Sequence, residues 1–196
     1  CSQHIQPNVL AALFTSAARV AVLRVFLIDP IRTYYQRQLE DATGLPLRAI
    51  QRELERLCAA GLLYRRAEGN RTYYQVDMDF VLFPELRSMV LKSLPPVDAL
   101  RAELALDDAV RLAFLGESRT QVLVVTRSAR RIGVSAPAGI TVETMTSEEF
   151  ARALAGKAAA LETYLVRGID LLGRRDDVIW RHIEAAGYDV KKGEGV

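Results

Sequence analysis

The side chains best suited to chemistry in this sequence are arginines and amides gathered between residues 36 and 76. Within Pro46–Ala60 they recur so that, at about 100° per residue, most fall on one side of a helix. Guanidinium groups donate paired hydrogen bonds to phosphate oxygens or to a base edge, whereas a carboxamide donates one hydrogen bond and accepts another. The candidate residues for such contacts are Arg37, Arg48, Gln51, Arg52, Arg56, Arg65, Arg66, Asn70 and Arg71.

Two helices joined by a tight turn are needed to position the first of these groups. Gln36–Thr43 predicts a short helix, and Gly44 follows where a left-handed cap residue is favoured. Pro46 is suited to the first turn of the next helix, because its missing N–H costs nothing there. The apolar arc of that second helix is predicted to hold Leu47, Ile50, Leu54, Leu57 and Cys58.

A β-hairpin is predicted directly after this pair of helices. Leu62–Ala67 and Arg71–Val76 are rich in aliphatic and aromatic residues, and they flank the short loop Glu68-Gly69-Asn70. The hairpin carries Arg65, Arg66 and Arg71. Before the helices, Arg32–Tyr35 is predicted to be a short extended piece or the start of the next helix, with its two tyrosines in the core or touching phosphates.

A helix-turn-helix followed at once by an arginine-bearing hairpin resembles the winged helix-turn-helix domain, most closely its arsenic-repressor-like branch. The resemblance implies that Pro46–Ala60 lies in the major groove of double-stranded DNA and the hairpin along the backbone or minor groove. Arg48, Gln51 and Arg52 would then read bases, and Arg65, Arg66 and Arg71 would hold phosphates. The competing interpretation is a solvated charged helix beside a solvated hairpin.

The first predicted helix, Val9–Ile28, is apolar on more than one face and therefore needs two partners. The helix within Phe80–Leu94, expected from Pro84 onward, is similarly apolar. In arsenic-repressor-like proteins the equivalent helices form the dimer interface, so the resemblance implies a homodimer. Pro95-Pro96 then marks a boundary between domains 1–95 and 96–196.

Composition favours an ordinary globular protein. Of its 196 residues, 50% are hydrophobic and 26% charged, and the net charge is +2. Residues 1–95 hold 12 Lys or Arg against 9 Asp or Glu, whereas residues 96–196 hold 14 against 15. No apolar run reaches the roughly 18 residues of a membrane span, and the polar start is unlike a signal peptide. Cys1 and Cys58 alone suggest a reducing compartment, so we expect a cytoplasmic protein without a thiolate metal site.

The second domain is predicted to be a small α/β unit with a partly mixed sheet, which makes the whole chain α+β. A Thr-x-x-Glu capping box at Thr146 predicts a helix ending before Gly156, and Asp176 or Asp177 caps a last helix ending at Gly187. Further helices are predicted at Val97–Leu106 and Lys157–Arg167. The predicted strands are Val110–Leu115, Gln121–Thr126, Ile140–Glu143 and Ile169–Leu172.

This element order, behind a winged helix, resembles the minimal nucleotidyltransferase domains. In an active member a strand runs into a Gly-Ser turn, and an Asp-x-Asp pair on the next strand binds divalent metals. Here the strand ends in Gly116-Glu117-Ser118, and no Asp lies between Asp108 and Asp170. The resemblance therefore implies a degenerate domain without catalytic residues, metal or cofactor. Such a domain would receive a protein partner or a small ligand.

Two alternatives remain open at this stage: a divergent nucleotidyltransferase targeted by a DNA-binding domain, and a protein-interaction adaptor. Glu117 and Glu143 are the acids that a divergent enzyme would use. Arg127, Arg130 and Arg131 could bind a phosphate, although a solvated loop is more common. His4, His182 and Trp180 are predicted to be surface or packing residues. The leading expectation is a cytoplasmic, dimeric transcriptional regulator that binds double-stranded DNA.

Overall fold

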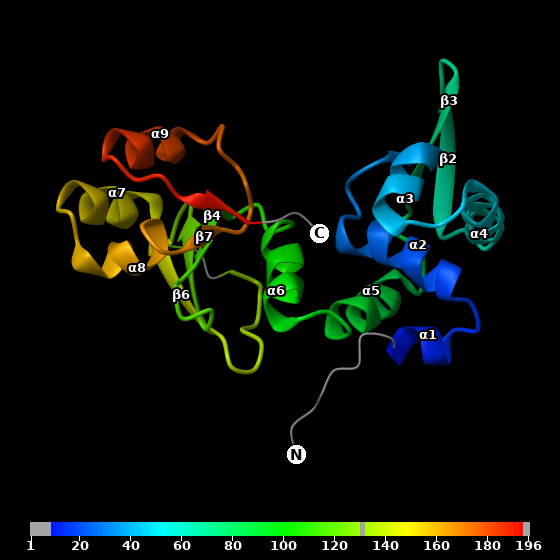
Figure 1. Ribbon diagram of the computed structural model, residues 1–196, viewed down its shortest axis with the longest axis horizontal. Helices are drawn as coiled ribbons and strands as arrows, with labels where there is room; N and C mark the ends of the chain where they lie inside the picture. Colours follow the sequence, from blue (N-terminus) through cyan, green and yellow to red (C-terminus); the bar gives the residue numbers. More distant parts are fainter. Residues whose placement is uncertain (1–8, 130–131, 194–196) are drawn as a thin grey trace. The chain divides into compact units, whose positions relative to one another are not determined.

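The computed structural model describes residues 9–129 and 132–193, and the chain divides into two compact units, residues 1–95 and 96–196. The division falls at the Pro95-Pro96 pair. Together the units are α+β with a mixed sheet in the second, as the sequence predicted. Figure 1 shows the elements of each unit.

In residues 9–95 an antiparallel three-stranded sheet packs with helices. The helices are α1 (Val9–Leu13), α2 (Ala17–Ile28), α3 (Gln36–Thr43), α4 (Leu47–Ala59) and α5 (Phe83–Lys92). The strands, in sheet order, are β1 (Tyr34–Tyr35), β3 (Arg71–Val76) and β2 (Leu63–Glu68). Helix α2 packs against α3, α4 and α5, and the β2–β3 hairpin extends beyond the helices (Figure 1).

The prediction of one continuous helix over Val9–Ile28 is wrong, because the chain breaks between α1 and α2. Ser16 has an extended backbone there, and its hydroxyl accepts a hydrogen bond from the Arg19 amide at 3.1 Å. A serine that caps a helix in this way satisfies one of the free amides of its first turn. The apolar residues of α2 still form the centre of the core, with Val22, Phe26 and Leu27 almost fully buried.

The predicted turn between α3 and α4 is present. Gly44 has a φ of 66°, in the left-handed region, and its amide donates to the Glu40 carbonyl at 2.8 Å. Helix α4 begins at Leu47, and Pro46 precedes it with an extended backbone. Arg32–Tyr35 ends in the short strand β1, in which Tyr34 is buried and Tyr35 is half-buried.

The hairpin turn is tighter than predicted. Glu68 pairs with Arg71, so the loop contains only Gly69 and Asn70. Gly69 has a φ of 57°, which a two-residue hairpin turn demands of its first central residue.

Residues 96–193 form a five-stranded sheet with helices on its faces (Figure 1). The helices are α6 (Pro96–Leu104), α7 (Ser147–Ala155), the 3₁₀ turn η1 (Ala159–Leu161), α8 (Glu162–Leu165) and α9 (Val178–Ala185). The strands, in sheet order, are β6 (Thr141–Thr146), β5 (Gln121–Thr126), β4 (Val110–Leu115), β7 (Ile169–Asp170) and β8 (Lys191–Lys192). β4 pairs antiparallel with β5 and β7, whereas β5–β6 and β7–β8 are parallel pairs.

Both faces of this sheet are covered by apolar clusters. Alternate residues of β4 and β5 point to opposite sides and so belong to different clusters. Phe114 and Leu123 pack with buried residues of α7, α8 and α9, including Trp180. Ala113 and Val122 belong to the second cluster, which buries α6 and residues of the segment 132–140. This two-sided burial explains why both strands read as nearly continuous apolar runs.

Several predicted bounds in this unit are wrong. The predicted helix Lys157–Arg167 is only η1 and α8, because Lys157 takes a positive φ of 47° and the backbone of Ala158 is extended. Strand β7 stops at Asp170, whose carboxylate accepts the amides of Leu172 and Gly173. Strand β6 is longer than predicted, and β8 was missed. The capping box at Thr146 and the Asp177 cap of α9 are confirmed.

Candidate nucleic-acid interface

Helix α4 presents a row of arginines on the side away from the core. Arg48, Arg52 and Arg56 recur every four residues and are exposed, whereas Ile50 and Leu54 are at most 1% exposed. Arg48 and Arg52 form no ion pair within residues 9–129. Two guanidinium groups on this row are therefore open to a polar ligand.

The predicted apolar arc of α4 is correct for Ile50, Leu54 and Leu57 but not for Leu47. Leu47 is 38% exposed and lines a cleft beside the hairpin turn. Its place at the very start of the helix lets its side chain leave the core.

Gln51 was predicted to read base edges, but it is half-buried and already engaged. Its Nε2 donates to Gln36 Oε1 at 3.2 Å, and Gln36 Nε2 donates to the Tyr74 hydroxyl at 3.4 Å. This chain of hydrogen bonds ties α4 to α3 and to β3. One Nε2 hydrogen of Gln51 is thus engaged within the fold, which leaves its second hydrogen and its Oε1 for a base.

The carboxylate of Glu53 holds Arg56. Arg56 Nη1 lies 2.9 Å from Glu53 Oε1, and Arg19 Nε lies 2.9 Å from Glu53 Oε2. Burial alone would raise the pKa of Glu53, but the hydrogen bond and charge of Arg19, with Arg56 and Ser16, outweigh it and lower the pKa. Glu53 was not among the predicted residues. Its spacing, three after Ile50 and four before Leu57, was the available signal for a buried position.

The hairpin arginines do not share one face. Arg65 pairs across the hairpin with buried Tyr74, whereas Arg66 pairs with Tyr73 on the other face. Arg66 Nη2 is also ion-paired to Glu68 at 3.0 Å. Arg65 and Arg66, both predicted to hold phosphates, therefore project from opposite faces of the hairpin.

Arg71 lies on the face of Tyr73 and is supported by an aromatic ring. Its guanidinium carbon lies 4.8 Å from the centre of the Tyr35 ring, which in turn packs edge-on against Tyr73. Arg37 and Asn70 line the same cleft, together with the carboxylates of Glu40 and Asp41. The predicted residues at the start of α3 and at the hairpin turn are thus neighbours.

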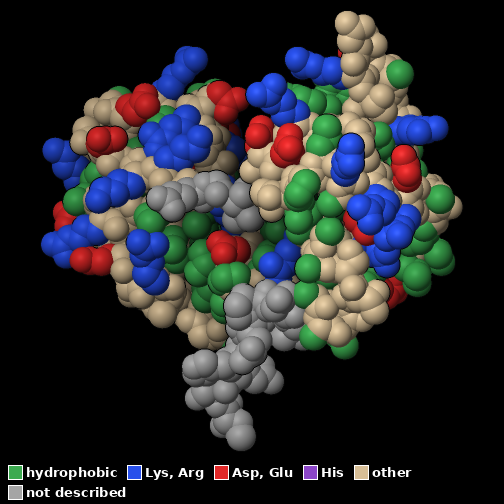
Figure 2. Space-filling model, turned by 45° about the vertical axis from the view of Figure 1, so that its right-hand side comes forward, with side chains coloured by type: hydrophobic (Ala, Val, Ile, Leu, Met, Phe, Trp, Pro, Cys, Tyr) green, Lys and Arg blue, Asp and Glu red, His purple; other side chains and the backbone are tan. Residues whose placement is uncertain are grey.

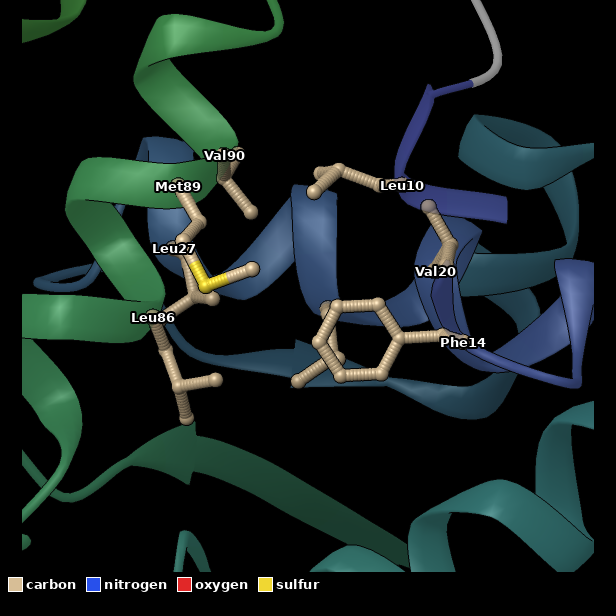
Figure 3. A pocket seen from close by; sticks show the side chains of 8 residues that line it. Leu10, Phe14, Val20, Leu27, Leu86, Met89 and Val90 are labelled. Carbon is tan, nitrogen blue, oxygen red and sulfur yellow. The ribbon is translucent and has the colours of Figure 1, made fainter. Parts of the chain in front are cut away.

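The surface of this unit also carries apolar side chains. Leu13, Val81 and Leu82 are exposed by 67%, 80% and 51%. In Figure 3, Leu10 and Phe14, Val20 and Leu27 of α2, and Leu86, Met89 and Val90 of α5 converge around a small apolar pocket. Most of the residues that line this pocket are buried, and Met89, at 37%, is the most exposed of them.

In residues 96–193 the turn after β4, which the sequence predicted to be degenerate, is closed by backbone hydrogen bonds. The Gly116 amide donates to the Gln121 carbonyl at 2.8 Å, and the Glu117 amide donates to the Thr163 carbonyl at 3.3 Å. Glu117 itself pairs with Arg167 at 3.1 Å. Burial, followed by the Glu143 carboxylate, raises the pKa of Tyr164 to about 12. Both acids therefore have internal partners.

Three other candidate residues, Trp180, His182 and Arg127, lie within residues 96–193. Trp180 packs in the core, 1% exposed, and its Nε1 donates to Glu184, so the packing prediction is confirmed. His182 is exposed on α9. Arg127 lines a polar cleft with Arg111, Arg174 and three aspartates. His4, Arg130 and Arg131 lie outside the described residues.

Cys58 is a half-buried free thiol whose pKa is raised by burial, against a smaller opposing effect of Arg65. No group of three or more His, Cys, Asp or Glu side chains suited to a metal occurs within residues 9–129 and 132–193. Figure 2 shows Lys and Arg side chains interspersed with acidic and apolar ones, so in this view no single basic face dominates.

None of the helices in the described parts of the chain has both the length and the apolar character of a membrane span. Comparison with models of known protein families, with curated proteins and with solved structures gave no significant match.

Proposed function

We propose that residues 1–95 are a winged helix-turn-helix domain that binds double-stranded DNA, and that the protein is a cytoplasmic, dimeric transcriptional regulator. The observation that carries this proposal is the row of exposed arginines on α4. Arg48 and Arg52 lie on the second helix of a helix-turn-helix, beside a hairpin that bears Arg71. Helix α4 enters the major groove, and the hairpin follows the backbone.

The groups divide by role according to their partners. Arg48 and Arg52, without ion pairs in the described part of the chain, contact base edges. Arg71, supported by Tyr35, contacts a phosphate together with Arg37. Arg66 contributes less, because Glu68 already neutralises it. Phosphate contacts position the protein, and base contacts give specificity.

The homodimer forms through the apolar surface of α1 and α5. Leu13 and Met89 belong to this surface, with exposed fractions of 67% and 37%. A two-fold dimer places two copies of α4 on successive half-sites, about 10 bp apart or a multiple of that distance.

Residues 96–196 act as a non-catalytic module that receives a partner or a small ligand. The support comes from the turn after β4, where the amides of Gly116 and Glu117 donate to backbone carbonyls. Those amides are then not available for a triphosphate, and the carboxylate of Glu117 is paired to Arg167. Nucleotidyl transfer requires metals held by carboxylates at fixed geometry.

Selection of bound sequences from random duplex DNA, followed by gel-shift assays, tests the proposal. We expect an inverted repeat, and an affinity that falls steeply with salt because phosphates release counterions. Light scattering should report a dimer at micromolar concentration. Failure to enrich any duplex contradicts the DNA-binding role, and a monomer contradicts the dimer.

A further inference from the structure

Glu53 is a buried carboxylate on the helix that also carries the exposed arginines. Its side chain is 5% exposed, although Arg52 and Glu55 beside it are exposed. A buried charge is stable only when it is paired and its oxygens are hydrogen-bonded. The partners of Glu53 therefore show what this residue organises.

Both oxygens of Glu53 are used, and the donors come from two helices. Oε2 accepts from Arg19 Nε at 2.9 Å, and Oε1 accepts from Ser16 Oγ at 3.3 Å. Oε1 also accepts from Arg56 Nη1 at 2.9 Å. Ser16 caps α2, so a single carboxylate joins the start of α2 to the guanidinium of Arg56.

Arg56 remains able to contact a ligand while Glu53 holds it. Its side chain is 54% exposed, and a guanidinium offers five N–H donors, of which Glu53 engages one of the two on Nη1. Recognition helices read bases with their N-terminal residues. Arg56 lies two turns after Arg48, near the C-terminal end of α4, where a backbone phosphate is the expected ligand.

We propose that Glu53 is a positioning residue for DNA recognition: it holds Arg56 against one phosphate and links that orientation to the first turn of α2. An unrestrained arginine loses rotamer freedom when it binds, and the clamp removes that cost before DNA arrives. The phosphate contact then fixes the register of α4 in the groove, which strengthens base reading by Arg48 and Arg52. This inference rests on the proposed DNA-binding function.

A double-mutant cycle between Glu53 and Arg56 tests the clamp. Glu53→Gln keeps the side-chain size but presents an amide to two guanidinium groups, so the clamp is lost. Glu55→Gln is the matched control, because Glu55 is exposed on the same helix and the charge change is equal. Affinities are measured for the selected duplex and for a scrambled duplex, at a temperature where thermal melts show every variant folded.

We expect Glu53→Gln to weaken binding of the selected duplex about tenfold relative to Glu55→Gln. Binding of the scrambled duplex should fall by less, because it loses the phosphate contact but has no base register to lose. In the Arg56→Ala background, Glu53→Gln should cost nothing further, because the group that it positions is gone. Ser16→Ala, a milder change, should show a smaller loss that also vanishes in that background, and it keeps the test available if Glu53→Gln unfolds.

A purely structural role gives a different result. Losses from Glu53→Gln and Arg56→Ala would then add, and the selected and scrambled duplexes would be affected alike. That outcome overturns the positioning role while leaving DNA binding intact. If the wild-type protein enriches and binds no duplex at all, the proposed function itself fails.

Discussion

The exposed face of α4 and the turn after β4 differ in whether their polar groups have partners within the protein. On α4, Arg48 and Arg52 are exposed without an ion pair among the residues described. At the β4–β5 turn, the amides of Gly116 and Glu117 and the carboxylate of Glu117 all have partners within the chain. Open polar groups are available for binding, whereas satisfied ones mainly stabilise the fold. The comparison favours a ligand surface in the first unit and a structural turn in the second.

The largest expected effect is a loss of stability in residues 96–196, where Gly168 is packed against backbone atoms. A Cβ at residue 168 would lie 2.2 Å from the Tyr164 carbonyl oxygen and 2.6 Å from that of Leu115. Backbone atoms cannot move aside cheaply, so Gly168→Ala should destabilise residues 96–196 by more than about 3 kcal/mol. Calorimetry should show the loss.

Gly133→Ala is the control, because a Cβ there meets no atom within 4 Å. Binding of the selected duplex by residues 1–95 should survive Gly168→Ala. Unchanged stability of the variant would mean that the turn is less tightly packed than its contacts indicate.

The next largest effect is a loss of DNA affinity, and it tests the exposed face of α4. Arg52→Ala should weaken binding of the selected duplex by about 1–3 kcal/mol and relax base preference at one position. The protein should keep its thermal stability, because Arg52 is exposed and forms no ion pair among the residues described. Gel shifts with single-base variants of the site measure both quantities. Specific binding that survives unchanged would remove α4 from the groove.

The same contrast explains what could be predicted from sequence. The turn at Gly44, the existence of the hairpin and the Thr146 cap depend on local chemistry, so they could be predicted, although the hairpin loop is one residue shorter than expected. The ion pairs of Glu53 and the internal hydrogen bond of Gln51 were not predicted, because their partners Arg19 and Gln36 come from other helices. The short strand β8 pairs with β7 across more than 20 residues and had no local signal.

A smaller effect tests an internal ion pair of the second unit. Arg111 binds both oxygens of Asp177 at 2.9 and 3.0 Å. Burial raises the pKa of Asp177, but the hydrogen bond of Arg111 and the Ile179 amide outweigh it, so the pKa lies below its ordinary value of 3.8. The pair therefore stabilises the fold above about pH 4, and this contribution is lost as the pH falls through the lowered pKa.

Asp177→Asn keeps a side chain that can cap α9 but removes the charge. It should cost about 1–2 kcal/mol at neutral pH and progressively less in acid. Denaturant unfolding across pH 2–7 measures the difference from wild type, with Asp176→Asn, a change at the exposed neighbour, as control. A cost that did not change with pH would point to packing instead of charge.

The smallest expected effect is the absence of nucleotide transfer. Transfer needs cations that neutralise charge on the phosphate oxygens, and those cations need carboxylates at fixed positions. Glu117 is held by Arg167, and the carboxylate of Glu143 lies close enough to Tyr164 to add to the effect of burial in raising the pKa of that tyrosine. Neither has an Asp neighbour on β5. Incubation with labelled nucleoside triphosphates and Mg²⁺ or Mn²⁺ should leave protein, RNA and other acceptors unlabelled. Label that disappears in Glu117→Gln or Glu143→Gln would instead make the second unit a divergent nucleotidyltransferase, and the turn after β4 would have to open during its reaction.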